Sequence, residues 1–188
     1  PLLHHALARV VEREVAAADR CGAGAAVGLE RVAVDGDLEL AEHGEVGASL
    51  CIRIDGSTVV DLWGGQTEPT GAPWGPDTLV NAFSVGKGLT ALVAAMLVDR
   101  GVLDYDTVVS RVWPGFTGGG KESLTFSDLL GHRAGLPAVR RTLPPRSMYD
   151  WDLMCRELAA TDPWWKPGTA HGYHVNSFGF LSGEVMRL

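Results

Sequence analysis

The sequence lacks any apolar run long enough to cross a bilayer, and it has few cysteines. A membrane-spanning helix needs about 20 mainly apolar residues, and no such run occurs among the 188 residues. The three cysteines, Cys21, Cys51 and Cys155, are far apart and form no Cys-x-x-Cys pair. Neither a disulfide framework nor a zinc site is therefore indicated, and we predict reduced, mostly buried thiols.

Positive charge is also scarce. The chain carries 16 lysines and arginines against 23 aspartates and glutamates, which gives a formal net charge of −7. A surface that binds nucleic acid or an anionic membrane needs an excess of basic side chains, so we predict neither as a partner. Residues 1–20 contain Glu12, Glu14 and Asp19 where a secretory signal would have an uninterrupted apolar region. We expect a cytoplasmic protein.

Two common enzyme motifs are absent. The Gly-x-Ser-x-Gly pattern of α/β-hydrolases is not met around Ser84, because Ala82 occupies the place of its first glycine. The glycine-rich stretch 115–122 ends in Lys121-Glu122, whereas a phosphate-binding loop requires Ser or Thr directly after the lysine to hold Mg²⁺. We interpret this stretch as a flexible surface loop, and we predict no nucleotide or other cofactor.

A metal site is not indicated either. His171 and His174 are three residues apart and would meet on one face of a helix, but no third histidine, cysteine or carboxylate stands at ligand spacing from them. Zinc sites in proteins have at least three protein ligands. We predict structural roles for both residues, no bound metal, and a His132 that holds its own loop by hydrogen bonds.

The composition is that of a soluble globular protein, with 46% hydrophobic and 21% charged residues. Apolar residues recur on one face of residues 1–20, which predicts an amphipathic helix, and glycines with mixed charges up to residue 43 indicate a connector. We therefore divide the chain into an N-terminal helix and connector, residues 1–43, and a domain over residues 44–188. The expected class is α/β, a sheet with a helical cluster.

This domain begins with a strong hairpin signal. Asp55-Gly56 separates two runs of β-forming residues, 48–54 and 57–63, and an Asp-Gly pair in that position is typical of a two-residue hairpin turn. The apolar pair Leu79-Val80 then predicts a short strand in front of a helix. Helices are predicted from periodicity and from start and stop signals over residues 88–99, 104–113, 126–131, 147–160 and 178–188.

The residues between this strand and the first of these helices carry the chemistry. Ser84-Val-Gly-Lys87 is the only Ser-x-x-Lys in the chain. Residues three apart share a helical face, which brings the Lys87 amine within reach of the Ser84 hydroxyl. The unpaired N–H groups of a first helical turn favour a developing oxyanion. Because serine reacts only beside a group that accepts its proton, we predict Ser84 as a nucleophile and Lys87 as its partner.

Three motifs resemble those of one family. Ser84-Val-Gly-Lys87 heads an apolar helix, Leu129-Leu-Gly-His-Arg-Ala-Gly-Leu-Pro137 follows, and Trp165-Lys-Pro-Gly-Thr-Ala-His-Gly-Tyr173-His comes after that. In this order, with Asp61-Leu-Trp-Gly-Gly65 upstream, they are similar to the serine β-lactamase and penicillin-binding-protein superfamily. The sequence is most similar to the class C β-lactamase-like carboxylesterases. The resemblance covers roughly residues 44–188 and implies a β-lactamase/transpeptidase-like fold.

The resemblance implies roles for three residues. Ser84 would form an acyl-enzyme, Lys87 would accept its proton or stabilise charge, and Tyr173 would be a second candidate base and later the donor to the leaving group. The Tyr-x-Asn pattern of β-lactamases is broken by Val175, which argues against a true β-lactamase and agrees with the esterase branch. We predict hydrolysis of small carboxylic esters. Acyl transfer and a catalytically silent binding module remain as alternatives.

The third active-site motif of the family, Lys-Thr-Gly or a His-x-Gly variant, lies far downstream in its members and is not met in these residues. The resemblance therefore implies that residues 44–188 correspond to the N-terminal portion of the hydrolase domain. We expect the rest of the fold to come from a second chain or from further C-terminal residues. The chain alone should associate. It should also hydrolyse esters at least about a hundredfold more slowly than a form completed by the rest of the fold, because one oxyanion donor would be missing.

Overall fold

The structure, a computed structural model, describes residues 32–33 and 44–188. The chain forms two compact units, Pro1–Val80 and Asn81–Leu188. The helix predicted over residues 1–20 lies outside the described residues, and the boundary predicted after residue 43 stays a prediction. Within the described ranges, no helix is both long and apolar enough to cross a membrane.

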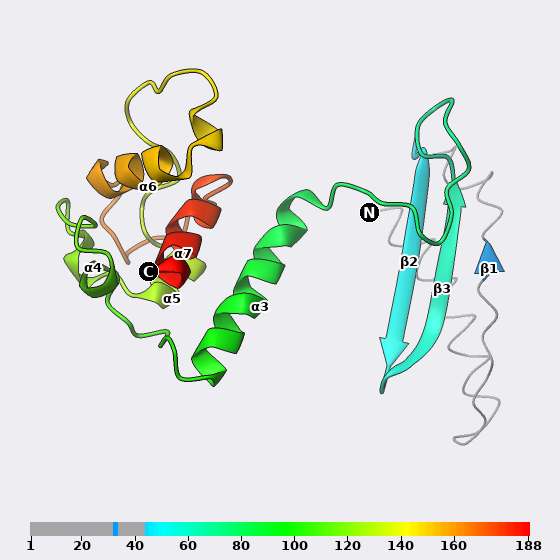
Figure 1. The fold of residues 1–188 in the computed structure, drawn as a ribbon, viewed down its shortest axis with the longest axis horizontal. Helices are drawn as coiled ribbons and strands as arrows, with labels where there is room; N and C mark the ends of the chain where they lie inside the picture. Colours follow the sequence, from blue (N-terminus) through cyan, green and yellow to red (C-terminus); the bar gives the residue numbers. More distant parts are fainter. Residues whose placement is uncertain (1–31, 34–43) are drawn as a thin grey trace. The chain divides into compact units, whose positions relative to one another are not determined.

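The described residues of the first unit form a three-stranded sheet with the strand order β1-β3-β2 (Figure 1). β2 (Gly47–Ile54) and β3 (Ser57–Gly65) are antiparallel, and β1 (Val32–Ala33) pairs in parallel with β3. Asp55 and Gly56 both have positive φ, 48° and 80°, as the turn that matches the twist of a hairpin requires. The predicted hairpin is confirmed, and β3 runs slightly past its predicted end.

The second unit is helical. Its α-helices are α3 (Gly86–Asp99), α4 (Val109–Val112), α5 (Phe126–Leu130), α6 (Trp151–Ala160) and α7 (Ser177–Arg187). Short 3₁₀ helices stand between them, namely η1 (Phe83–Val85), η2 (Lys121–Ser123) and η3 (Ser147–Tyr149). Figure 1 shows α7 in red, and this helix packs against α3, α5 and α6. The buried core between α5, α6 and α7 includes Phe126, Leu129, Leu158, Leu181 and Val185.

The strand predicted at Leu79-Val80 is wrong. The two side chains are 96% and 66% exposed, and none of the described strands pairs with them. An apolar pair forms a strand only where a partner strand accepts its backbone hydrogen bonds. The helix predicted over residues 88–99 is confirmed as α3, although it starts earlier, at Gly86.

The helix predicted over residues 104–113 is much shorter than expected, because α4 covers only Val109–Val112. The Asp104 carboxylate accepts the N–H of Asp106 at 2.8 Å, and the Thr107 hydroxyl accepts the N–H of Asp104 at 3.2 Å. Such local side-chain bonds offer the backbone an alternative to helical hydrogen bonds. The first residues of the predicted helix therefore form a turn.

Capping residues set the starts of α5 and α6. Thr125 Oγ1 accepts the Asp128 N–H at 3.3 Å and the Asp128 carboxylate accepts the Thr125 N–H at 3.1 Å, which forms a capping box at the start of α5. The single helix predicted over residues 147–160 is wrong, because Asp150 has an extended backbone and its carboxylate accepts the Leu153 N–H at 3.0 Å. This aspartate is the N-cap of α6 and separates the helix from η3.

The glycine-rich stretch 115–122 does not lie wholly at the surface, which corrects the prediction of a surface loop. The glycines at 118–120 all have positive φ, and the Lys121 side chain that follows is only 1% exposed. Its Nζ donates to the carbonyl oxygens of Ala159 and Thr161, the second at 2.9 Å. These carbonyl groups end α6, where a cation is stabilising. The glycines thus turn the lysine towards the end of another helix.

The cysteines differ in exposure. Cys155 on α6 is buried, and burial raises the pKa of its thiol to about 12. Cys51 on β2 is free and exposed, so the prediction of buried thiols is wrong for this residue. Cys21 lies outside the described residues.

Candidate active site

Ser84 lies in η1, immediately before α3. The preceding residue, Phe83, has a left-handed backbone with a φ of 43°, which is rare for a bulky side chain. Its N–H donates to Asn81 Oδ1 at 3.0 Å, and the Gly86 N–H bonds back to the carbonyl groups of Phe83 and Ser84. These bonds hold a strained turn, and the Ser84 side chain is exposed at the entrance of the helix.

The side chain of Lys87 lies beside that of Ser84. Its Nζ donates to Ser84 Oγ at 3.2 Å, as the three-residue spacing predicts. The same nitrogen lies 4.9 Å from the centroid of the Tyr173 ring and 5.9 Å from that of the Phe178 ring. A lysine side chain over aromatic faces is attracted by their π electrons. One hydroxyl and two rings therefore fix the position of the amine.

Tyr173 comes from the segment before α7 and joins this pair. Hydrogen bonding from the side chains of Ser84 and Lys87 lowers the pKa of its phenol below the ordinary value, which is near 10. The positive charge of Lys87 acts in the same direction. The three residues that the sequence and the resemblance single out thus meet at one point.

His174, the residue after Tyr173, is fully buried. Its Nε2 accepts the Leu136 N–H at 2.9 Å, and its Nδ1 lies 2.5 Å from the carbonyl oxygen of Gly172. Because a backbone N–H can only donate, Nε2 carries no proton and Nδ1 is the donor to Gly172. Burial lowers the pKa of His174, so the ring is neutral at pH 7. It ties the Tyr173 segment to the loop after α5.

Three imidazoles gather beside Tyr173, but they do not form a metal site. The His132 ring centroid is 5.7 Å from that of His171 and 5.5 Å from that of His174. Both ring nitrogens of His174 bond to backbone groups, and Nδ1 of His132 accepts the His174 N–H at 3.0 Å. Among the residues that the structure describes, no cluster of three or more His, Cys, Asp or Glu side chains is able to hold a metal ion.

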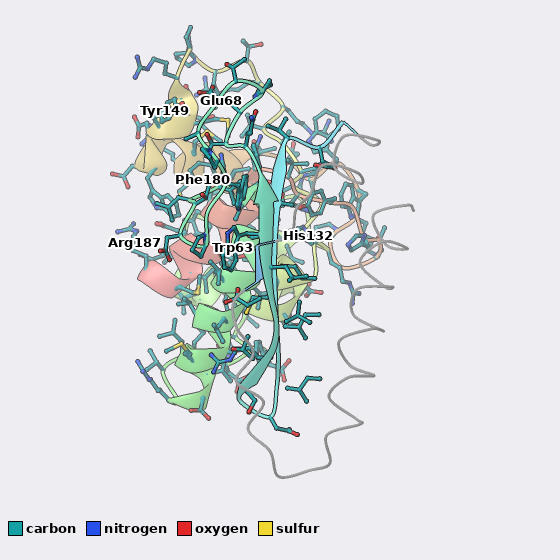
Figure 2. All side chains as sticks on the ribbon, turned by 90° about the vertical axis from the view of Figure 1, so that its right-hand side faces the viewer. Trp63, Glu68, His132, Tyr149, Phe180 and Arg187 are labelled. Atoms are coloured by element: carbon teal, nitrogen blue, oxygen red, sulfur yellow. The ribbon has the colours of Figure 1, made fainter. Side chains whose placement is uncertain are left out.

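A pocket lies just beyond the Tyr173 segment. Val175 is 55% exposed, and the next two residues, Asn176 and Ser177, line a cavity of about 650 Å³. Neither Ser84 nor Tyr173 belongs to its lining. The remaining lining is mostly apolar and consists of Pro137, Ala138, Val139, Leu143, Pro144, Arg146, Ser147, Met148, Tyr149, Met154 and Leu158. Figure 2 labels Tyr149, which is 85% exposed.

Two features of the site were not predicted from the sequence. The left-handed turn at Phe83 contains no glycine at the residue with positive φ. The one sequence signal for a turn there is Asn81, a residue that favours turns. His132 was expected to hold its own loop, and its bonds confirm this: its N–H donates to the Leu129 carbonyl at 3.1 Å. Its bond to His174, which reaches the Tyr173 segment, could not be read from the sequence.

Comparison with known proteins identifies the family. The sequence matches the Beta-lactamase family over residues 8–187, and the chain belongs to this family. Over 142 residues it is 37% identical to the Esterase/beta-lactamase LipL of Mycobacterium tuberculosis, an alignment that covers 75% of this chain and 33% of that protein.

Solved structures agree with the family. A family VIII carboxylesterase superposes with a TM-score of 0.74 at 44% identity, over 79% of this chain and 40% of the other. A penicillin-binding-protein homolog from Caulobacter crescentus superposes with a TM-score of 0.76 at 42% identity, over 80% of this chain and 41% of the other. The predicted β-lactamase/transpeptidase-like fold is confirmed. The chain spans about a third of the curated relative and about 40% of the solved ones.

Proposed function

We propose that the chain is a serine hydrolase that acts on small carboxylic esters through an acyl-enzyme on Ser84. The observation that carries the proposal is the 3.2 Å hydrogen bond between Lys87 Nζ and Ser84 Oγ, with the ring of Tyr173 4.9 Å from the same Lys87 nitrogen. A serine hydroxyl attacks a carbonyl group efficiently only when a neighbouring group takes its proton. Two such groups face Ser84 here.

In the proposed acylation, Ser84 Oγ attacks the ester carbonyl carbon while its proton passes to the neutral Lys87 amine or to the Tyr173 phenolate. The bond between this carbon and the alcohol oxygen breaks, the alcohol leaves with the proton, and the acyl group stays on Ser84. Water then attacks the acyl carbon and gives a proton to the same base. The bond between the acyl carbon and Ser84 Oγ breaks, the base returns the proton to Oγ, and the acid leaves with Ser84 restored. The lowered pKa of Tyr173 supports a phenolate at lower pH than an ordinary tyrosine would.

Small esters as substrates are supported by the relatives and by Val175. The relatives include proteins named an esterase/β-lactamase and a carboxylesterase. Val175, 55% exposed, offers no amide at the position where the β-lactamase pattern has one.

Two alternatives share parts of this proposal. Acyl transfer to an alcohol or amine uses the same first half-reaction, and product analysis with an added alcohol distinguishes it from hydrolysis. A binding role without turnover is favoured by one observation, that the chain spans about 40% of the solved structures it matches. If the chain forms and then releases an acyl-enzyme, it is a catalyst. If it does not, the binding role is favoured.

We also propose that a second chain or further C-terminal residues cover α3. Within the unit Asn81–Leu188, this helix buries only Ala94, and its exposed apolar side chains are Leu89, Leu92, Val93 and Met96, at 62%, 57%, 49% and 44%. Contiguous apolar surface of this kind marks an interface. Because the chain spans about 40% of the family VIII carboxylesterase, we expect the missing part of the same fold as the occupant.

A chimera tests this completion. The 188 residues alone should associate in sedimentation experiments. Joined to the C-terminal part of the family VIII carboxylesterase, they should form monomers and hydrolyse esters at least about a hundredfold faster, as expected when a missing oxyanion donor is supplied. A monodisperse 188-residue monomer that is as active as the chimera would contradict the proposal.

Ester hydrolysis by variants tests the function itself. A chromogenic short-chain ester should be hydrolysed by the wild type, and Ser84→Ala should abolish this turnover because it removes the attacking hydroxyl. Ser123→Ala, which changes an exposed serine, is the control and should keep full activity. Equal turnover in Ser84→Ala and the wild type would refute the proposed function.

A further inference from the structure

A single residue bonds the backbone on both sides of Tyr173. The carbonyl oxygen of His132 accepts the N–H of Gly172 at 3.1 Å, and its imidazole Nδ1 accepts the N–H of His174 at 3.0 Å. These two N–H groups belong to the residues directly before and after Tyr173. His132, labelled in Figure 2, thus fixes the backbone of Tyr173 at two points.

His132 itself has a rare backbone conformation. Its φ is 58°, a left-handed value that residues other than glycine adopt only where the surroundings enforce it. Its N–H donates to the Leu129 carbonyl at 3.1 Å, and the N–H of the next residue, Arg133, donates to the Asp128 carbonyl at 2.8 Å. The end of α5 therefore holds His132 in the conformation from which both its carbonyl and its imidazole reach the Tyr173 segment.

The imidazole of His132 also lies against two aromatic rings. Its centroid is 4.9 Å from that of Tyr173 and 4.9 Å from that of Phe178, with interplanar angles of 48° and 32°. Lys87 Nζ faces the same two rings. Close packing against an imidazole that is itself hydrogen-bonded restricts the rotation of the Tyr173 ring.

The bond to His174 requires a neutral His132. Since a backbone N–H can only donate, Nδ1 of His132 must be free of a proton and Nε2 carries it. Burial lowers the pKa of His132, and the charges of His171 and Lys87 lower it further. The titratable groups around the ring are Lys87 on α3 and His171, Tyr173 and His174 on the segment before α7. Protonation of Nδ1 would remove the acceptor.

We infer that His132 is a positioning residue, which holds the Tyr173 phenol against Ser84 and Lys87 by fixing the backbone on both sides of Tyr173 and by packing on its ring. The inference rests on the proposed function, because His132 acts on the reaction only through Tyr173. Small displacements of a catalytic group reduce the rate steeply, so the two backbone bonds matter for catalysis as well as for the fold.

Two substitutions separate the hydrogen-bond acceptor from the rest of the imidazole. His132→Asn keeps a side-chain acceptor near the place of Nδ1 and tolerates a positive φ better than most residues, whereas His132→Ala removes the acceptor. His171→Ala is the matched control, because it removes an exposed imidazole from the same cluster, 5.7 Å from His132. Circular dichroism establishes that each variant is folded.

We expect His132→Ala to lower kcat for ester hydrolysis about tenfold to a hundredfold with little change in KM, since a misplacement of about 1 Å costs about a hundredfold. His132→Asn and His171→Ala should stay close to the wild type. A purely structural role would not produce a loss in kcat alone that the asparagine restores.

A titration of Tyr173 provides a readout that needs no turnover. Tyr105→Phe with Tyr149→Phe leaves Tyr173 as the only tyrosine of the chain, and NMR of its ¹³C-labelled Cζ follows the ionisation of the phenol. In this background His132→Ala should raise the pKa of Tyr173 towards the ordinary value, and His132→Asn should not. The titration tests positioning, and Ser84→Ala tests the reaction, so failure of one is distinguishable from failure of the other.

The inference is overturned if folded His132→Ala keeps the kcat and the Tyr173 pKa of the wild type, or if His132→Asn loses as much kcat as His132→Ala.

An experiment at acid pH replaces His132→Ala where this variant does not fold, because protonation of His132 removes the acceptor in the wild type. Because the pKa of His132 is lowered, the kcat of the wild type should then fall reversibly at a pH below the ordinary histidine value of about 6.5, and that of His132→Asn should fall less. An equal loss of kcat at acid pH in the wild type and in His132→Asn would also overturn the inference.

Discussion

The side-chain nitrogen of Lys87 lies over the ring of Tyr173, 4.9 Å from its centroid. The two residues come from different parts of the helical unit, α3 and the segment before α7, and the same Lys87 nitrogen donates to Ser84 Oγ at 3.2 Å. Lys87 therefore acts on Ser84 directly and on Tyr173 through its charge. Two candidate bases serve one nucleophile, and substitution of each in turn distinguishes them.

Lys87→Ala should lose most of the acylation rate if the lysine amine accepts the proton of Ser84. Lys87→Arg should not restore it, because a guanidinium group does not lose its proton in a protein. Hydrolysis of a chromogenic ester measures both variants, with Lys166→Ala, at an exposed lysine, as the control. An arginine variant as active as the wild type would rule out Lys87 as the proton acceptor.

Tyr173→Phe removes the phenol and keeps the ring over Lys87. If the phenolate is the base, kcat/KM of the wild type should rise with pH and level off below about pH 10, where an ordinary tyrosine ionises. The reason is that hydrogen bonds with Ser84 and Lys87 lower the pKa of Tyr173. The phenylalanine variant should lose this rise and about 10²–10⁴ in rate. Full activity of Tyr173→Phe at every pH would assign the tyrosine to packing.

The parts of the site that could be predicted from the sequence are those set by neighbouring residues. The contact between Ser84 and Lys87 follows from a spacing of three on a helical turn, and the turn at Asp55-Gly56 follows from two residues that accept positive φ. The place of Tyr173 beside Lys87 depends on packing between distant segments. It was expected from the family resemblance, and no local pattern in the sequence announces it.

The remaining features depend on contacts that no local pattern contains. Leu79 and Val80 have the composition of a strand, but none of the described strands pairs with them. The left-handed backbone of His132 depends on bonds to α5 and to the Tyr173 segment. The sequence predicts Asp150 inside a helix, whereas in the structure its side chain caps the start of α6. An aspartate near a helix start is compatible with either position.

Folding stability should fall at mildly acid pH because His174 is buried and neutral. Its pKa in the folded chain is lowered, whereas in the unfolded chain it is near 6.5. Between these two values the unfolded chain binds more protons, so stability rises with pH. The contribution is fully present above about pH 6.5 and is lost as the pH falls below it, by at most about 1.4 kcal/mol per pH unit for one histidine.

Urea denaturation between pH 5 and pH 7.5 measures this loss. The lowered pKa of His132 adds to it in the same direction, so His174→Gln should reduce the slope without abolishing it. Carboxylates such as Glu184, whose pKa hydrogen bonds from Arg187 lower, add to the loss only at the acid end of this range, where the unfolded chain begins to protonate them. Stability that is equal or higher at pH 5 than at pH 7 would contradict a neutral, buried His174.

Acylation of Ser84 tests the central claim most directly. Intact-mass measurement after incubation with a fluorophosphonate probe should show a covalent adduct on the wild type and on Ser123→Ala, and peptide mapping should place it on Ser84. Ser84→Ala should carry none, because the nucleophile held by Lys87 at 3.2 Å is gone. A wild type without adduct, or a Ser84→Ala chain labelled as fully as the wild type, would contradict the assignment of Ser84 as the nucleophile.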